Sequence, residues 1–208
     1  ATKVASGNWV IDSNPIVSGL YNPNTCIVET NGTIWIAQDS PKGGEWSALS
    51  RLKEPWGSST LEEVISDFGT APTNQQDQAC DLAFVPTSWG GTYPQLAVLD
   101  RGVNANNNPN AIWLVDPATL TLNQAVYNNF LVAPNNTSFG AGIAGNANAI
   151  AALPATGELL TVWEDGVSNS VATADDAVIM AWDSTGTGRQ ISTTTGSGKN
   201  GWFAGLAV

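Results

Sequence analysis

Acidic residues end the second predicted strand of three similar segments of the chain, and they are the first candidates for chemistry. They are Asp39, Asp100 and the pair Glu164–Asp165. If the three segments are related by symmetry, these carboxylates converge at one end of the fold. Converging carboxylates repel one another unless a cation or protons intervene, and Ca²⁺ is a hard cation that prefers oxygen ligands. The pattern therefore predicts a calcium site formed by Asp39, Asp100, Glu164 and Asp165.

A bound cation at this place would act as a Lewis acid or activate a water molecule, and one of Asp39, Asp100 or Glu164 would be the catalytic base. Asp81 and Glu29, on predicted first strands, are expected to point into a central channel nearby. The alternative is that all these acids are solubilising or turn-capping groups, because the chain has no dense Asp-x-Asp-x-Asp loop. Serine-nucleophile chemistry is disfavoured, since there is no histidine and no Gly-x-Ser-x-Gly sequence.

Tryptophans in loops suggest a second kind of site. Trp46, Trp56 and Trp89 lie in connections rich in Gly, Ser and Pro. Their rings would serve as platforms for sugars, or would anchor the loops, and we favour anchoring. Four further tryptophans fall inside predicted strands and are expected to pack between sheets: Trp35, Trp113, Trp163 and Trp182.

The elements that position these residues recur along the chain. Each segment contains four short apolar or alternating runs bounded by turn residues, and the segments cover residues 25–69, 79–132 and 146–195, with a partial fourth at 201–208. Repeated four-strand units are typical of β-propeller blades. We therefore expect one all-β domain over residues 1–208, a β-propeller-like fold of about three four-stranded blades plus a lone strand.

Ring closure has several possible solutions, because propellers usually need about four to eight blades. The chain would belong to a longer protein, or two copies would pair into a ring of about six blades, or subunits would exchange strands. Residues 8–12 would form an outer strand completing a blade whose inner strands come from the C-terminal side. Unpaired edges at both ends would otherwise favour aggregation.

Local patterns predict individual elements. Residues 60–68 carry apolar residues at helical spacing, and Thr60 with Glu63 fits a capping box, yet their place in the repeat favours an outer strand, which we prefer. Asn31-Gly32 predicts a tight hairpin with positive φ at both residues. Asp116 and Asp183 follow the third strands and are predicted to close turns.

Composition narrows the classes of partner. The 208 residues carry a net charge of −11, and only 12% are charged. This charge disfavours nucleic acid, polyanionic substrates and anionic membranes. No apolar run approaches the roughly 20 residues needed to span a bilayer, so membrane insertion is not expected. A surface rich in Asn, Thr, Ser and Gly is typical of a secreted or cell-surface β protein.

Two further features favour an extracellular location. Cys26 and Cys80 open the first strands of neighbouring segments, so we expect them side by side as a disulfide, with two buried free thiols as the alternative. Asn31, Asn135 and Asn136 begin Asn-x-Thr/Ser sites, which matter if the source is eukaryotic.

Three stretches carry a resemblance to a known superfamily: Trp202–Val208, Gln95–Gly102 and Ile112–Asp116. They resemble secreted β-propellers of the gluconolactonase-like and phytase-like kind. The first kind implies one divalent cation at the channel mouth, held by acidic and amide side chains. The second implies basic phosphate ligands, and the basic residues available here are few and dispersed: Arg51, Lys53, Arg101 and Arg189.

The sequence thus predicts an extracellular or cell-surface binding and assembly module. Its expected partners are further copies of itself or a longer parent chain, with a glycan or small molecule as ligand. The alternatives are a calcium-dependent hydrolase of the lactonase or phytase-like type and a carbohydrate-binding lectin.

Overall fold

The computed structural model describes twelve stretches of the chain, and within them the fold is all-β with no α-helix. No described helix is long and apolar enough to cross a membrane. The described residues are 2–3, 9–10, 16–39, 47–53, 60–65, 79–85, 87–89, 94–100, 111–123, 146–164, 177–185 and 187–194.

Three four-stranded antiparallel sheets dominate the fold, and each is built from four consecutive strands. The first sheet contains β3 (Pro23–Val28), β4 (Ile34–Asp39), β5 (Ser47–Leu52) and β6 (Glu62–Ile65). The second contains β7 (Ala79–Val85), β8 (Gln95–Asp100), β9 (Ala111–Val115) and β10 (Leu122–Asn123). The third contains β11 (Asn146–Leu153), β12 (Glu158–Glu164), β13 (Ala177–Trp182) and β14 (Gly188–Thr194). A short 3₁₀ turn, η2 (Thr87–Trp89), follows β7.

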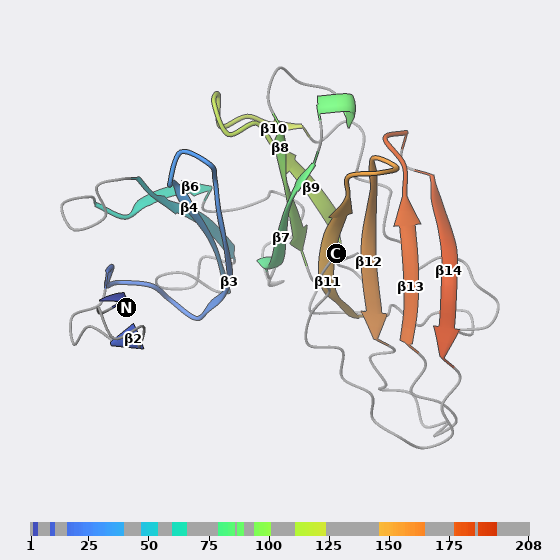
Figure 1. The fold of residues 1–208 in the computed structure, drawn as a ribbon, viewed down its shortest axis with the longest axis horizontal. Coiled ribbons are helices and arrows are strands. Elements are labelled where there is room, and N and C mark those ends of the chain that lie inside the picture. Colours follow the sequence, from blue (N-terminus) through green and yellow to red (C-terminus); the bar gives the residue numbers. More distant parts are fainter. Residues whose placement is uncertain are drawn as a thin grey trace, which may run out of the picture.

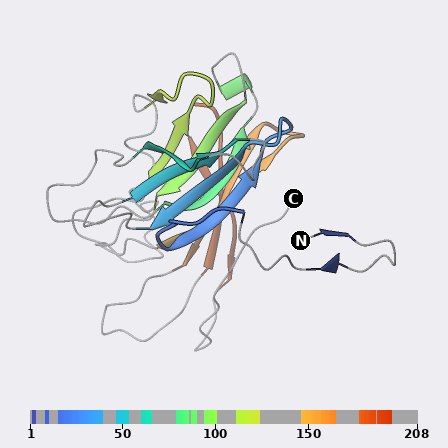
Figure 2. The ribbon, with the colours of Figure 1, turned by 90° about the vertical axis from the view of Figure 1, so that its left-hand side faces the viewer.

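The sheets pack face to face, with the second sheet in the middle (Figure 1). Alternation along β8 explains how one sheet serves two neighbours: Leu96 and Val98 face the first sheet, whereas Ala97 and Leu99 face the third. We call the two contacts the first interface, between the first and second sheets, and the second interface, between the second and third. The described strands form an open stack that does not close into a ring (Figure 2).

Strand positions agree closely with the sequence pattern, because alternation and turn residues act locally. The ambiguous stretch at 60–68 is a strand over Glu62–Ile65, as we prefer, and residues 66–68 lie outside the described part. The first strands of the three sheets each contain a register shift at the same place, opposite the end of the second strand: Pro23/Thr25, Ala79/Asp81 and Ala147/Ala149.

The turns follow the expected chemistry with one difference. Asp116 Oδ1 accepts the Ala118 N–H at 2.8 Å, and Asp183 Oδ1 accepts the Thr185 N–H at 2.9 Å, so both acids close turns. The hairpin after β3 has positive φ only at Gly32, at 88°. Its loop is longer by one residue than the two-residue turn we expect from Asn31-Gly32, with a left-handed Gly at its end.

The described N-terminal residues form a strand pair of their own, which the sequence does not predict. β2 (Trp9–Val10) pairs with β1 (Thr2–Lys3) as a two-stranded sheet that stands apart from the other three (Figures 1 and 2). We expect residues 8–12 to complete a blade with strands from the C-terminal side, and this pairing stays a prediction because residues 195–208 lie outside the described part. Residues 201–208, the expected partial fourth unit, lie outside the described part.

The predicted disulfide is wrong, since Cys26 and Cys80 are not bonded to each other. Ile27 packs into the first interface, so alternation places its neighbour Cys26 on the opposite, exposed face of the first sheet. Cys80 instead packs into the second interface, where its Sγ–H donates to the Leu99 carbonyl at 3.3 Å. The first and second sheets therefore both lie between these two thiols.

Candidate functional site

The predicted acidic site lies where β4, β8 and β12 end, and the register shows an offset within it. Asp100 pairs with Ala79, just before the shift in β7, which is the position of Gln38 in the first sheet. Asp39 and Glu164 lie one residue further along their strands. Successive residues of a strand alternate between the two faces of a sheet. Asp100 therefore lies on the opposite face of its strand from the one that Asp39 and Glu164 occupy on theirs.

The side chains of Asp39, Asp100 and Glu164, and the whole of Asp165, lie outside the described part of the structure. Among the side chains that are described, no group of three or more Cys, Asp or Glu is arranged to hold a metal ion. Calcium binding and a catalytic carboxylate at this end of the stack therefore stay predictions.

Asp81 lies where the first strands of all three sheets meet. Its Oδ2 accepts the backbone N–H of Ile150 on β11 at 2.9 Å, its Oδ1 accepts that of Leu82 at 2.9 Å, and the Thr25 side chain on β3 also bonds to it. Burial raises the pKa of this carboxyl above its ordinary value, and the hydrogen bonds oppose that rise only in part. Asp81 thus ties three sheets together.

A second tie on the same strands uses a side-chain amide. Asn24 Nδ2 donates to the Ala79 carbonyl at 2.9 Å, from β3 to the edge of β7. Together with Asp81, it satisfies backbone groups at the inner edges of β7 and β11 that would otherwise attract another strand. These contacts make the junction of first strands a structural centre rather than an open site.

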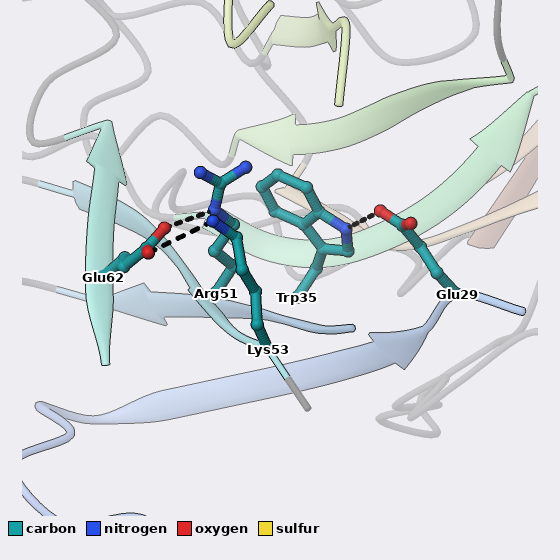
Figure 3. Close-up of polar contacts among 5 residues, drawn as sticks. All are labelled: Glu29, Trp35, Arg51, Lys53 and Glu62. Atoms are coloured by element: carbon teal, nitrogen blue, oxygen red, sulfur yellow. Dashed lines mark hydrogen bonds and ion pairs between the residues drawn. The ribbon is translucent and has the colours of Figure 1, made fainter. Parts of the chain in front are cut away.

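A charged cluster at the hairpin end of the first sheet is the most developed polar site in the described structure (Figure 3). Trp35, on β4, is nearly fully buried, and its Nε1–H donates to Glu29 Oε1 at 2.5 Å. Glu29 was expected to point into a channel, but it is held at the hairpin, where Oε2 also accepts from Asn31 Nδ2 at 2.6 Å. Asn31 Oδ1 in turn accepts the Thr33 N–H at 2.8 Å.

The cationic part of this cluster lies on the other side of the Trp35 ring (Figure 3). The Arg51 guanidinium sits over the ring, with Cζ 5.7 Å from its centroid. Arg51 Nε donates to Glu62 Oε2 at 2.6 Å, and Lys53 Nζ to Glu62 Oε1 at 3.2 Å. These two bonds, that of Arg51 foremost, lower the pKa of Glu62 below its ordinary value.

Pairing across the last hairpin of the first sheet assembles these groups. Arg51 and Glu62 are direct cross-strand partners of β5 and β6, and Trp35 is the partner of Arg51 on β4. The sequence contains a signal for this ion-pair cluster. Two basic residues, Arg51 and Lys53, lie at the end of one strand, and the acidic Glu62 begins the next. From the sequence, Arg51 and Lys53 are expected only as dispersed phosphate ligands, so this site is not predicted.

The loop tryptophans divide between the described and undescribed parts. Trp89 is 5% exposed, packs into the second interface and donates from Nε1 to the Gly157 carbonyl, so it anchors its loop. Trp46 and Trp56 lie outside the described residues, as do Asn135 and Asn136. Sugar binding at Trp46 and Trp56 stays a prediction.

Comparison with known proteins adds no relative: no family model, no curated protein and no solved structure matches this chain.

Proposed function

We propose that this chain is an extracellular or cell-surface binding and assembly module whose sheets are β-propeller blades and which associates with a second copy of itself. Each sheet has the antiparallel order of four consecutive strands that a blade has. The first strands β3, β7 and β11 lie next to one another, as blade strands do around an axis. The low content of charged residues, 12%, supports the location.

The proposal depends mainly on the location of the large apolar side chains that are exposed. In the described structure all of them lie on the two outer sheets or on the segment leading into the first, and none lies on the middle sheet: Ile16, Tyr21, Val28 and Ile191. Single exposed apolar residues are common on proteins. Their restriction to the two sheets that have a neighbour on one side only favours contact with a further sheet.

The register of the stack indicates which surfaces would meet. Ala37 faces the second sheet and Leu99 faces the third, and each follows the register shift of its sheet. Val162 holds the position in the third sheet that Ala37 and Leu99 hold in the other two. By the same rule it faces away from the second sheet, so the outer face of the third sheet is the one that would contact a further sheet. Because Val162 itself is buried within the chain, we expect contact at the margins, through Ile191 on one copy and Val28 on the other.

The test is the mass of the full chain in solution, by native mass spectrometry and light scattering. We expect a defined dimer that Val28→Glu or Ile191→Glu weakens, since these side chains are 53% and 47% exposed and a buried charge is costly. The matched control is Thr119→Glu, at an exposed turn of the middle sheet, which should leave the dimer intact.

A monomer at all concentrations would overturn the proposed assembly, and so would a dimer whose stability is unchanged by both substitutions. The same spectra recorded with and without chelator test the calcium-dependent alternative separately, because a bound ion changes the mass of each species.

A further inference from the structure

Arg51 is held in a defined position, yet of the five N–H groups of its guanidinium only the one on Nε has an acceptor within the described structure. The Trp35 ring supports the guanidinium on one face, and Glu62 holds Nε at 2.6 Å. The Arg51 side chain is only 15% exposed. Within the described structure neither terminal amino group has a hydrogen-bond acceptor, and neither is sealed from solvent.

Arg189 provides a direct comparison on the third sheet. Its Nε and Nη2 donate to Glu158 at 2.9–3.1 Å, and Nη2 reaches both carboxylate oxygens. Glu158 therefore engages Arg189 from the side, through Nε and Nη2, and the Arg189 side chain is 61% exposed. The fork of Arg51 is engaged only through Nε, although Arg51 is the more buried of the two.

Local charge also favours an incoming anion. On the Arg51 side of the Trp35 ring, Arg51 and Lys53 both contact the Glu62 carboxylate, so two cationic groups lie close together here. Glu29 lies on the other side of the ring, where Trp35 and Asn31 already use both of its oxygens. The whole chain carries −11, so a single negative charge suits this site better than a polyanion.

We propose that the terminal amino groups of Arg51 bind a ligand carboxylate end-on. Two parallel N–H···O bonds from a planar guanidinium match a carboxylate, and they are stronger when the guanidinium is partly desolvated and held in place. Trp35 and Glu62 position the group, and Lys53 adds charge at the margin. The ligand class is a monocarboxylate, carried by an acidic sugar or by a peptide terminus. This site is separate from the proposed assembly surfaces.

The experiment follows the arginine Nε–H signals of the ¹⁵N-labelled full chain while acetate replaces chloride at constant ionic strength. The chain has three arginines, and an Arg→Lys substitution at each one assigns its signal. We expect a saturable shift of the Arg51 signal and no comparable shift of Arg189, because Nη2 of Arg189 is already bonded to Glu158 and its side chain is much more exposed. Glucuronate and N-acetylglycine are then titrated in turn, and the tighter one identifies the source of the carboxylate.

Glu62→Gln sharpens the test because it removes the competing negative charge and keeps a side chain of the same size. We expect acetate to bind this variant more tightly than the wild type. An Arg51 signal that moves no more than that of Arg189, or affinity that is unchanged by Glu62→Gln, would overturn the proposal. Neither outcome depends on the oligomeric state.

Discussion

The two interfaces of the stack each bury a large tryptophan, and they satisfy its N–H in opposite ways. In the first interface Trp35 donates to the carboxylate Glu29, with the Arg51 guanidinium over its ring. In the second interface Trp182 donates to the neutral hydroxyl of Thr161 at 2.7 Å, and both groups are buried. The first arrangement ends in charged groups at the margin of the sheet, and the second is sealed within the core.

A tryptophan N–H can thus be bonded either to a neutral acceptor within the core or to a charged acceptor at the margin, where we propose a binding site. A neutral acceptor allows Trp182 and its acceptor Thr161 both to be buried, because no charge has to be desolvated. The charged acceptor of Trp35 lies near solvent, where the charged groups of Arg51, Lys53 and Glu62 join the cluster. We therefore expect the second interface to be sensitive to volume and hydrogen bonding, and the first to pH and anions.

The largest effect is expected at Gly188, which lies beneath the Trp182 ring. A Cβ at this position would come within 2.3–2.8 Å of three atoms of the six-membered ring. Gly188→Ala should destabilise the fold by about 2–3 kcal/mol, because overpacking a close-packed core forces side chains from their preferred positions. Urea denaturation of the full chain measures this change.

A double-mutant cycle identifies the cause. Trp182→Phe removes the ring atoms that the new methyl would meet, so Gly188→Ala should cost much less in that background. Additive effects of the two substitutions would show that the close approach is not the source of the instability.

Removing the two acceptors should give unequal losses. Thr161→Val keeps the shape but deletes the hydroxyl that accepts from Trp182, and we expect a cost of about 2 kcal/mol in the buried interface. Glu29→Ala deletes the acceptor of Trp35 at a margin that water reaches, so about 1 kcal/mol or less is expected. Equal losses, measured by the same denaturation assay, would contradict the distinction between sealed and open interfaces.

The smallest effects are expected from pH, with opposite signs for two carboxylates. The pKa of Asp81 is raised in the folded state, so this group makes the fold less stable as pH rises from 3.8 toward neutrality. The pKa of Glu62 is lowered, so it contributes stability above 4.5 that is lost as pH falls through its folded pKa. Stability is measured against pH for the wild type, Asp81→Asn and Glu62→Gln.

Relative to the wild type, Asp81→Asn should become more stable as pH rises, and Glu62→Gln should become less stable. High salt should reduce only the Glu62 effect, because Glu62 is exposed and its ion pairs are screened. Parallel pH profiles for the wild type and either variant would contradict the assigned shift.

Much of the fold was predictable because strand formation is governed by short-range patterns. The alternation in Ile34–Asp39 and the turn chemistry of Asp116 and Asp183 each depend on a few adjacent residues, and the structure confirms them. The disulfide between Cys26 and Cys80 failed for the complementary reason. Their matched positions in sequence were visible, but the face on which each thiol lies depends on how the sheets stack.

The polar sites show the same division. The acids at the ends of β4, β8 and β12 recur in sequence and so predict one shared site. The register of the strands offsets Asp100 from the other two acids by one residue. Arg51 and Glu62 meet through cross-strand pairing, and Trp35 must lie beside them for the guanidinium to be held. No single local pattern contains all three.

The sequence by itself determined that the chain forms consecutive short antiparallel strands, where most of them begin and end, and which acids close turns. Hydrogen bonding of adjacent strands and alternation of side chains are local, so they can be recognised from a few residues. Only the tertiary structure decided that Asp81 joins three sheets, that Trp89 and Trp182 are enclosed, and that Arg51 retains an open fork. These depend on contacts between residues distant in sequence, which are set by the packing of one sheet on the next.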